Sequence, residues 1–262
     1  MSLMIIVALI LSGLLVGFIN TLAGGGTIIS ISLLMFLGLP APVANGTNRI
    51  AVMFQNLTAV RNFHKSGILQ SAKGLWLSIP TIAGSLIGAS VVVNLNENVI
   101  EKAIAGIMIV MLFFILIKPG IWMKGNEKLM NRPLNWKTHT IFFFIGLYGG
   151  FIHIGVGYFI LAALVMNCGF DLIRANALKN FLVLLYVPLT LIVFVFQGLV
   201  MWEYGLIHAI GNVIGAYIAS KYAVKWGNNF VRWIIVFVII ISISDLLNIV
   251  DIKTLISTLM TQ

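Results

Sequence analysis

The chain has 262 residues, of which 60% are hydrophobic and 9% are charged, and its mean hydropathy is +1.08. This composition excludes a soluble globular protein and indicates a polytopic membrane protein. The formal net charge is +9, but the basic residues are scattered through short loops between apolar runs. They therefore indicate membrane topology and not nucleic-acid binding.

Apolar runs separated by helix-breaking residues predict five helical segments in each half of the chain. In the first half these are residues 3–22, 27–38, 43–64, 74–95 and 99–117. In the second half they are residues 139–154, 157–168, 174–197, 203–221 and 229–249. Most have about the 20 residues that cross a bilayer, whereas the second segment of each half has only about 12. We expect an all-α polytopic membrane protein with about eight full spans and two short, broken or re-entrant helices.

Two similar patterns, about 131 residues apart, indicate that the halves are repeats. Each pattern combines a glycine-interrupted apolar segment with a polar cluster where the next helix begins. The first comprises residues 23–27 and 44–49, and the second residues 155–158 and 175–180. The glycine-spaced segments 84–89 and 211–216 also correspond, although such spacings are common packing motifs in membrane helices. We divide the chain into a first transmembrane repeat (1–117), a basic cytoplasmic linker (118–138) and a second repeat (139–262).

The distribution of Lys and Arg predicts the orientation of the two repeats. If the chain crosses the membrane an odd number of times in each repeat, most basic residues face the cytoplasm, and only Arg49, Lys102 and Lys253 lie outside. If instead the two segments on either side of each glycine break together cross the membrane once, the excess of Lys and Arg on the cytoplasmic side nearly disappears. The charges therefore favour inverted repeats in a bacterial cytoplasmic (inner) membrane, with both termini outside.

Polar side chains at bilayer depth are costly, and they often mark a functional site. Three successive glycines in the first break allow the backbone to turn and to expose N–H groups at a helix start, where anions bind. The candidates around this break are Asn20, Gly24, Gly25, Gly26 and Thr27. The next predicted helix adds Asn45, Thr47, Asn48, Arg49, Gln55 and Asn56, several of them on neighbouring turns of one face.

The second repeat contributes His153, Asn176, Lys179 and Asn180 to the predicted site. His153 corresponds to Asn20; it is either a proton carrier or a packing residue that hydrogen-bonds a neighbour. Arg49 opposes the positive-inside tendency, so it either extends to the lipid headgroups or binds a ligand. Lys179, in contrast, lies on the cytoplasmic side in this topology, so the positive-inside tendency alone explains a basic residue there. Together the two cations predict an anionic substrate, because guanidinium and ammonium groups bind oxoanions.

The candidate breaks contain no carboxylate, so the sequence does not predict a cation site there. The chain also lacks a His or Cys spacing for a metal, a phosphate-binding loop ending in Gly-Lys-Ser/Thr, and a nucleophile elbow. We therefore expect no catalytic residues, no metal and no cofactor, and we do not expect an enzyme.

The residues 17–27, followed by 37–40 and 44–49, resemble those of the sulfite exporter TauE/SafE family, also grouped as toluenesulfonate uptake permeases. The resemblance covers nearly the whole chain. It implies a permease of the bacterial cytoplasmic membrane that moves small sulfur-containing anions such as sulfite or organosulfonates. Residues 155–158 depart from the pattern because they lack a glycine triplet, which leaves open whether both halves contribute equally.

We therefore hypothesise a secondary transporter that works by alternating access, as its two halves rock around a central anion site. Coupling to protons or sodium, and the oligomeric state, are left open. One alternative is a carrier of cations or metal ions. Another is a non-transporting membrane scaffold protein, whose polar residues only tie the broken helices together.

Overall fold

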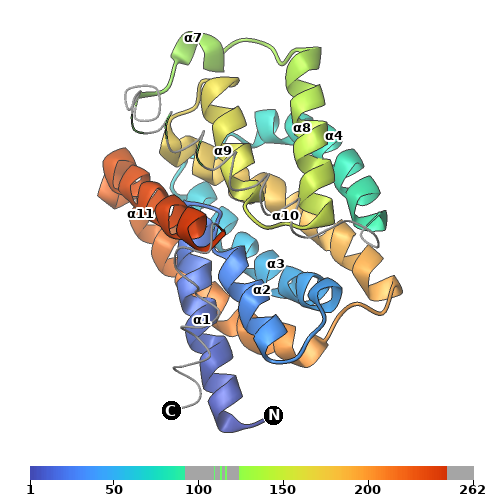
Figure 1. Ribbon diagram of the computed structural model, residues 1–262. Coiled ribbons are helices and arrows are strands. Elements are labelled where there is room, and N and C mark those ends of the chain that lie inside the picture. The colour runs from blue at the N-terminus through green and yellow to red at the C-terminus, as the bar shows by residue number, and fades with distance from the viewer. Residues whose placement is uncertain (92–108, 110–112, 114–115, 117–123, 247–262) are drawn as a thin grey trace.

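The computed structural model describes residues 1–91 and 124–246, together with residues 109, 113 and 116. Within these residues the chain forms helices and no strands, which confirms the all-α prediction (Figure 1). Most of the predicted segment 99–117, the end of the predicted segment 74–95, the first part of the predicted linker and the end of the last segment lie outside the described residues.

The helices of the first repeat agree closely with the predicted segments. They are α1 (Leu3–Leu22), α2 (Thr27–Phe36), α3 (Ala41–Lys65) and α4 (Ser71–Ser90). Pro40 precedes α3, where its fixed φ and missing N–H suit a helix start. The helix α2 has only 10 residues, as predicted for the short member of the pair.

The predicted second repeat follows the short helix α7 (Glu127–Met130). It contains α8 (Trp136–Phe151), α9 (Val156–Met166), α10 (Leu172–Phe196) and α11 (Trp202–Leu246). The long α11 is two helices joined at a kink, because Gly227 has a φ of 78° and a non-helical backbone. These two parts correspond to the two predicted segments 203–221 and 229–249.

Two of the described helices are long and apolar enough to cross a membrane by composition alone. They are α1 and α10. The helix α3 is as long as α10, at 25 residues. It is less apolar, because it carries the polar cluster that includes Asn45, Arg49 and Gln55. The number of full spans stays a prediction.

The most extensive helix contacts join α1 to α11 and α4 to α8. Glycines make both contacts close. A Cβ on Gly211 would clash with the carbonyl oxygen of Ile10, and a Cβ on Gly84 would clash with that of Phe143. Small residues of this kind allow helix backbones to approach closely. The glycine-spaced segments of both repeats therefore serve as packing surfaces.

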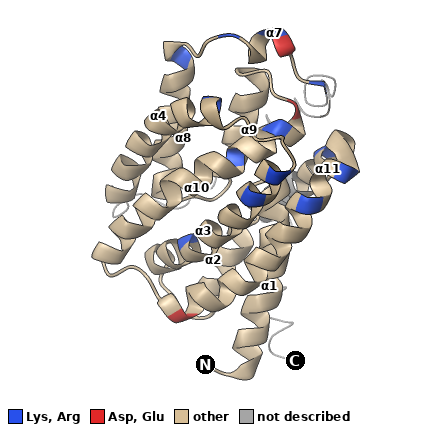
Figure 2. Cartoon of the chain, turned by 180° about the vertical axis from the view of Figure 1, so that it is seen from behind, with Lys and Arg blue, Asp and Glu red and all other residues tan. Residues whose placement is uncertain are grey.

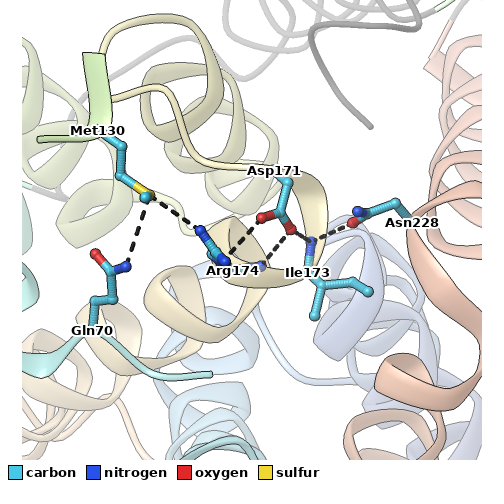
Figure 3. A network of polar contacts seen from close by, with 6 residues as sticks. All are labelled: Gln70, Met130, Asp171, Ile173, Arg174 and Asn228. Atoms are coloured by element: carbon cyan, nitrogen blue, oxygen red, sulfur yellow. Dashed lines mark hydrogen bonds and ion pairs between the residues drawn. The ribbon is translucent and has the colours of Figure 1, made fainter. Parts of the chain in front are cut away.

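The contact between α3 and α10 lies in the middle of the bundle (Figure 1). Most basic residues gather toward the end that holds α7, and few lie near the amino terminus of α1 (Figure 2). At the α7 end, the amino-terminal N–H groups of α10 are capped by Asp171, whose Oδ1 accepts from Ile173 N at 3.0 Å and Arg174 N at 3.1 Å (Figure 3).

Candidate functional site

The two glycine-containing breaks meet each other inside the bundle. Gly24 has a φ of 87°, and a Cβ built on it would lie 2.5 Å from the Cα of Gly157. A side chain at either position would push the breaks apart, because this contact is between backbones. The segments predicted to correspond in the two repeats are therefore in direct contact.

Asn20 holds the first break together. Its Oδ1 accepts from Thr27 N at 3.1 Å, while its Nδ2 donates to Thr27 Oγ1 at 3.2 Å and to Gln55 Oε1 at 3.4 Å. The first of these bonds satisfies an N–H group at the start of α2. Asn20 therefore bridges the interruption between α1 and α2 and ties it to α3.

His153 has the corresponding place in the second break. Its φ of 65° is in the left-handed region, which costs a non-glycine residue about 1 kcal/mol. Its Nδ1 lies 3.0 Å from the hydroxyl of Tyr186, which follows Gln55 by the repeat distance. Tyr158 takes the place of a glycine triplet, and its hydroxyl fills the space beside Gly25. The departure from the glycine pattern is thus accommodated by packing against the first break.

Lys179 on α10 caps the carboxyl end of α1. Its Nζ donates to Asn20 O at 2.7 Å, to Thr21 O at 3.0 Å and to Asn176 Oδ1 at 2.9 Å. An ammonium group has three N–H donors, so all of them are used. A cation at this position also compensates the negative end of the α1 dipole.

Arg49 on α3 caps the carboxyl end of α8 in a similar way. Its Nη2 donates to Gly150 O at 2.6 Å and to Gly149 O at 3.3 Å, and its Nη1 donates to Thr190 Oγ1 at 2.7 Å. The guanidinium also stacks on Phe194, with 4.4 Å from Cζ to the ring centroid. Arg49 is fully buried, so the interpretation that it extends to the lipid headgroups is wrong.

A small cavity lies where the two breaks, α3 and α10 converge. Its volume is about 20 Å³, which is space for about one water molecule. Seven predicted residues line it, and they come from both repeats: Asn20, Gly24, Thr27, Gln55, Asn56, His153 and Lys179. The other lining residues are Val156 and Gly157, which belong to the predicted second break, and Val52 and Val183, which the sequence did not single out.

The remaining predicted residues are buried beside the cavity, and none of them lines it. Asn45 Nδ2 donates to Phe151 O at 2.8 Å, and Thr47 Oγ1 accepts from Met201 N at 3.0 Å. Asn180 Nδ2 donates to Thr21 O at 3.2 Å, while Asn48 has no hydrogen-bond partner for its amide in the described part of the chain. Arg49, Gly25, Gly26 and Asn176 complete this supporting group.

The region around the cavity carries positive charge without a negative partner. Arg49 and Lys179 are both buried, and neither forms an ion pair with a carboxylate of the described residues. Their partners are neutral carbonyl, hydroxyl and amide oxygens. Because burying unpaired charge is costly, this environment favours a bound anion.

Two residues that contact the predicted site residues, Tyr186 and Thr190, were not singled out from the sequence. Tyr186 could have been found, because it lies 131 positions after Gln55 and both contact a residue of the break in their own repeat. Thr190 could not have been found in this way, because the residue 131 positions before it is Ala59, which has no polar side chain.

Three relatives show what this chain is similar to. A probable membrane transporter protein of Sinorhizobium is 27% identical over 231 residues, which cover 88% of this chain and 87% of the relative. The probable membrane transporter protein YfcA of Escherichia coli strain K12 is 27% identical over 226 residues, with coverages of 86% and 83%. The probable membrane transporter protein YunE of Bacillus subtilis is 25% identical over 244 residues, with coverages of 82% and 86%.

The model of the family described as sulfite exporter TauE/SafE matches residues 9–246. The chain belongs to the sulfite exporter TauE/SafE family. The resemblance seen in the first break and the polar cluster is thereby confirmed, as is the membrane setting that the composition predicted. The relatives have the names of transporters and not of enzymes. No solved structure matches this TauE/SafE chain.

Proposed function

We propose that this TauE/SafE protein is a permease for small sulfur-containing anions such as sulfite or organosulfonates. It works by alternating access in a bacterial cytoplasmic membrane. The observation that carries the proposal is the position of the buried Lys179 ammonium, which lies on the cavity wall and has no carboxylate partner among the described residues.

The magnitude of the electrostatic term supports an anionic substrate. A unit anion 4 Å from a unit cation gains on the order of 4 kcal/mol at an effective dielectric constant of about 20. A cation at the same place would lose a similar amount. Asn20, Gln55, Asn56 and His153 line the same cavity, and their neutral polar groups add hydrogen bonds that a small oxoanion accepts.

The cavity must widen to bind this substrate. A volume of about 20 Å³ holds about one water molecule, and sulfite is larger than that. The described conformation is therefore a closed one, in which Lys179, Asn20 and Thr27 satisfy one another or the neighbouring backbone. Opening on one side and then on the other moves the anion across.

We further propose that the two repeats have opposite orientations, with both termini outside. The gathering of basic residues at the α7 end supports this, because positive residues favour the cytoplasmic side (Figure 2). The reciprocal contacts of α1 with α11 and of α8 with α4 also support a pair of related units. Helices α1 and α2 then form one re-entrant pair, and α8 and α9 form the other.

Uptake into liposomes tests this function. The purified protein is reconstituted, and uptake of labelled sulfite is measured with thiosulfate, sulfoacetate or taurine as competitor, with and without a pH gradient. We expect saturable uptake that thiosulfate and sulfoacetate inhibit more strongly than taurine, which carries no net charge at neutral pH. Protein-free liposomes give the background.

The same assay identifies the alternatives. Saturable uptake of a labelled metal cation without uptake of any anion would show a cation carrier. Absence of any uptake, together with no change in thermal stability on adding the four compounds, would show a scaffold protein.

A further inference from the structure

The helices pack into two units that exchange one helix between the sequence repeats. Helices α1, α2 and α3 pack together with α11, whereas α8, α9 and α10 pack together with α4. We call these the α1 unit and the α8 unit. Each repeat therefore gives its fourth helix to the unit built on the other repeat.

Each unit is closely packed internally. In the α1 unit, Gly211 and Gly215 lie against backbone carbonyls of α1, and in the α8 unit Gly84 and Gly88 lie against those of α8. Glycines at such contacts allow two helix backbones to approach each other closely. Asn62 on α3 also donates to Ser220 Oγ on α11 at 2.9 Å. We therefore expect each unit to move as one body.

The contact between the units combines the packing of α3 against α10, the backbone contact of Gly24 with Gly157 and a set of polar bonds. Arg49 extends from the α1 unit to the carboxyl end of α8, and Lys179 extends from the α8 unit to the carboxyl end of α1. Asn45 and Asn180 add parallel bonds to Phe151 O and Thr21 O. Each cation thus belongs to one unit and caps a broken helix of the other.

A second contact between the units lies at the α7 end. Asn228 on α11 accepts from Ile173 N at the start of α10, with an N–O distance of 2.9 Å (Figure 3). The same N–H also donates to Asp171 Oδ1 at 3.0 Å within its own unit. Because Ile173 keeps a partner when Asn228 leaves, this contact can open without exposing an unpaired donor.

We propose that the α1 unit and the α8 unit are the bodies that move during transport, with Arg49 and Lys179 as the positioning residues that join them. This rests on the proposed alternating-access function. It differs from rocking of the sequence halves 1–117 and 139–262, because α4 and α11 travel with the opposite repeat. The Asn228 contact is the part that separates when the α7 end opens.

Distances between spin labels distinguish the two kinds of motion. Labels are attached to pairs of introduced cysteines in a Cys168→Ala background, which removes the single native cysteine. The first pair is Lys65→Cys with Lys225→Cys, two exposed positions of the α1 unit. The second is Lys137→Cys with Lys225→Cys, which joins the two units, although both positions lie on helices of the predicted second repeat, α8 and α11. Distances are measured in liposomes with and without sulfite.

If the units move, sulfite shifts the Lys137/Lys225 distance by several ångströms and leaves the Lys65/Lys225 distance unchanged. If the sequence halves move, the Lys65/Lys225 distance changes and the Lys137/Lys225 distance does not, which overturns the proposal. Two unchanged distances in a protein that takes up sulfite also overturn it. Each labelled variant is first shown to retain sulfite uptake.

Failure of the proposed function gives a different result. If the unlabelled protein takes up none of the anions, the anion permease is wrong. The widths of the two distance distributions without sulfite then still test the units. A Lys137/Lys225 distribution that is no broader than the Lys65/Lys225 distribution overturns the present inference in either case.

Discussion

Arg49 and Lys179 have similar places in the two repeats, and both cap the carboxyl end of the first helix of the other repeat. Their surroundings differ. Lys179 forms part of the cavity wall, whereas Arg49 lies behind it, between Phe194, Thr190 and the end of α8. The comparison shows that residues at similar positions of the two predicted repeats can share one role, the capping of a helix end, and differ in whether they also line the cavity. Both cations cap a broken helix, and of the two only Lys179 lines the cavity where the proposed substrate would bind.

Replacement of Lys179 by Met gives the largest expected effect on transport. The substitution removes on the order of 4 kcal/mol of attraction for the anion, which corresponds to an affinity loss of about 1,000-fold. The measurement is the sulfite concentration dependence of uptake into liposomes. The matched control is Lys137→Met, because Lys137 is exposed at the start of α8. Equal uptake by the Lys179→Met variant and the control would falsify a substrate role for this residue.

Replacement of Arg49 by Gln tests the other side of the comparison. The carbonyls of Gly149 and Gly150 and the hydroxyl of Thr190 lose a shared charged donor, so we expect a loss of about 3 kcal/mol of stability. The measurement is thermal unfolding of the purified protein in detergent. The sequence left open whether Arg49 binds a ligand, and the three bonds indicate that it stabilises the end of α8. An unaltered unfolding temperature would contradict the capping role.

Replacement of Asn176 by Asp tests the charge of Lys179 while the lysine itself stays in place. Asn176 Oδ1 already accepts from Lys179 Nζ at 2.9 Å, and a carboxylate of the same shape would neutralise the ammonium. We expect about 2 kcal/mol weaker sulfite binding, which is about 30-fold, with little change in the unfolding temperature. Asn229→Asp, at an exposed position in the second part of α11, is the control. Unchanged sulfite affinity in Asn176→Asp would show that the Lys179 charge does not reach the substrate.

Replacement of Thr190 by Val gives the smallest expected effect. The hydroxyl accepts from Arg49 Nη1 at 2.7 Å and does not line the cavity. Loss of this bond costs about 1 kcal/mol of stability and leaves sulfite affinity within about twofold. Thr190→Ser restores the bond. Thr81→Val is the control, since the Thr81 hydroxyl bonds only to a carbonyl of its own helix. A large affinity loss in Thr190→Val would place Arg49 closer to the substrate than the cavity indicates.

The sequence predicted the helices well, because apolar runs and their breakers are local features. The segment 3–22 coincides with α1, and the short segments 27–38 and 157–168 correspond to α2 and α9. It also predicted seven residues of the cavity wall, since glycine breaks and buried amides are visible in the chain. The partners of Arg49 were not predictable in this way. They are backbone carbonyls of Gly149 and Gly150, and a carbonyl is present at every residue.

The sequence by itself determined that this is an all-α membrane protein with the motifs of the TauE/SafE family, and it predicted a positive site between glycine-containing breaks. Composition, hydrophobic periodicity and the repeat spacing carry that information. Only the tertiary structure decided that Lys179 meets the cavity and Arg49 does not, and that α4 and α11 pack on the opposite repeat. These depend on which backbones touch, and the close glycine contacts that decide it form only when helices distant in the chain come together.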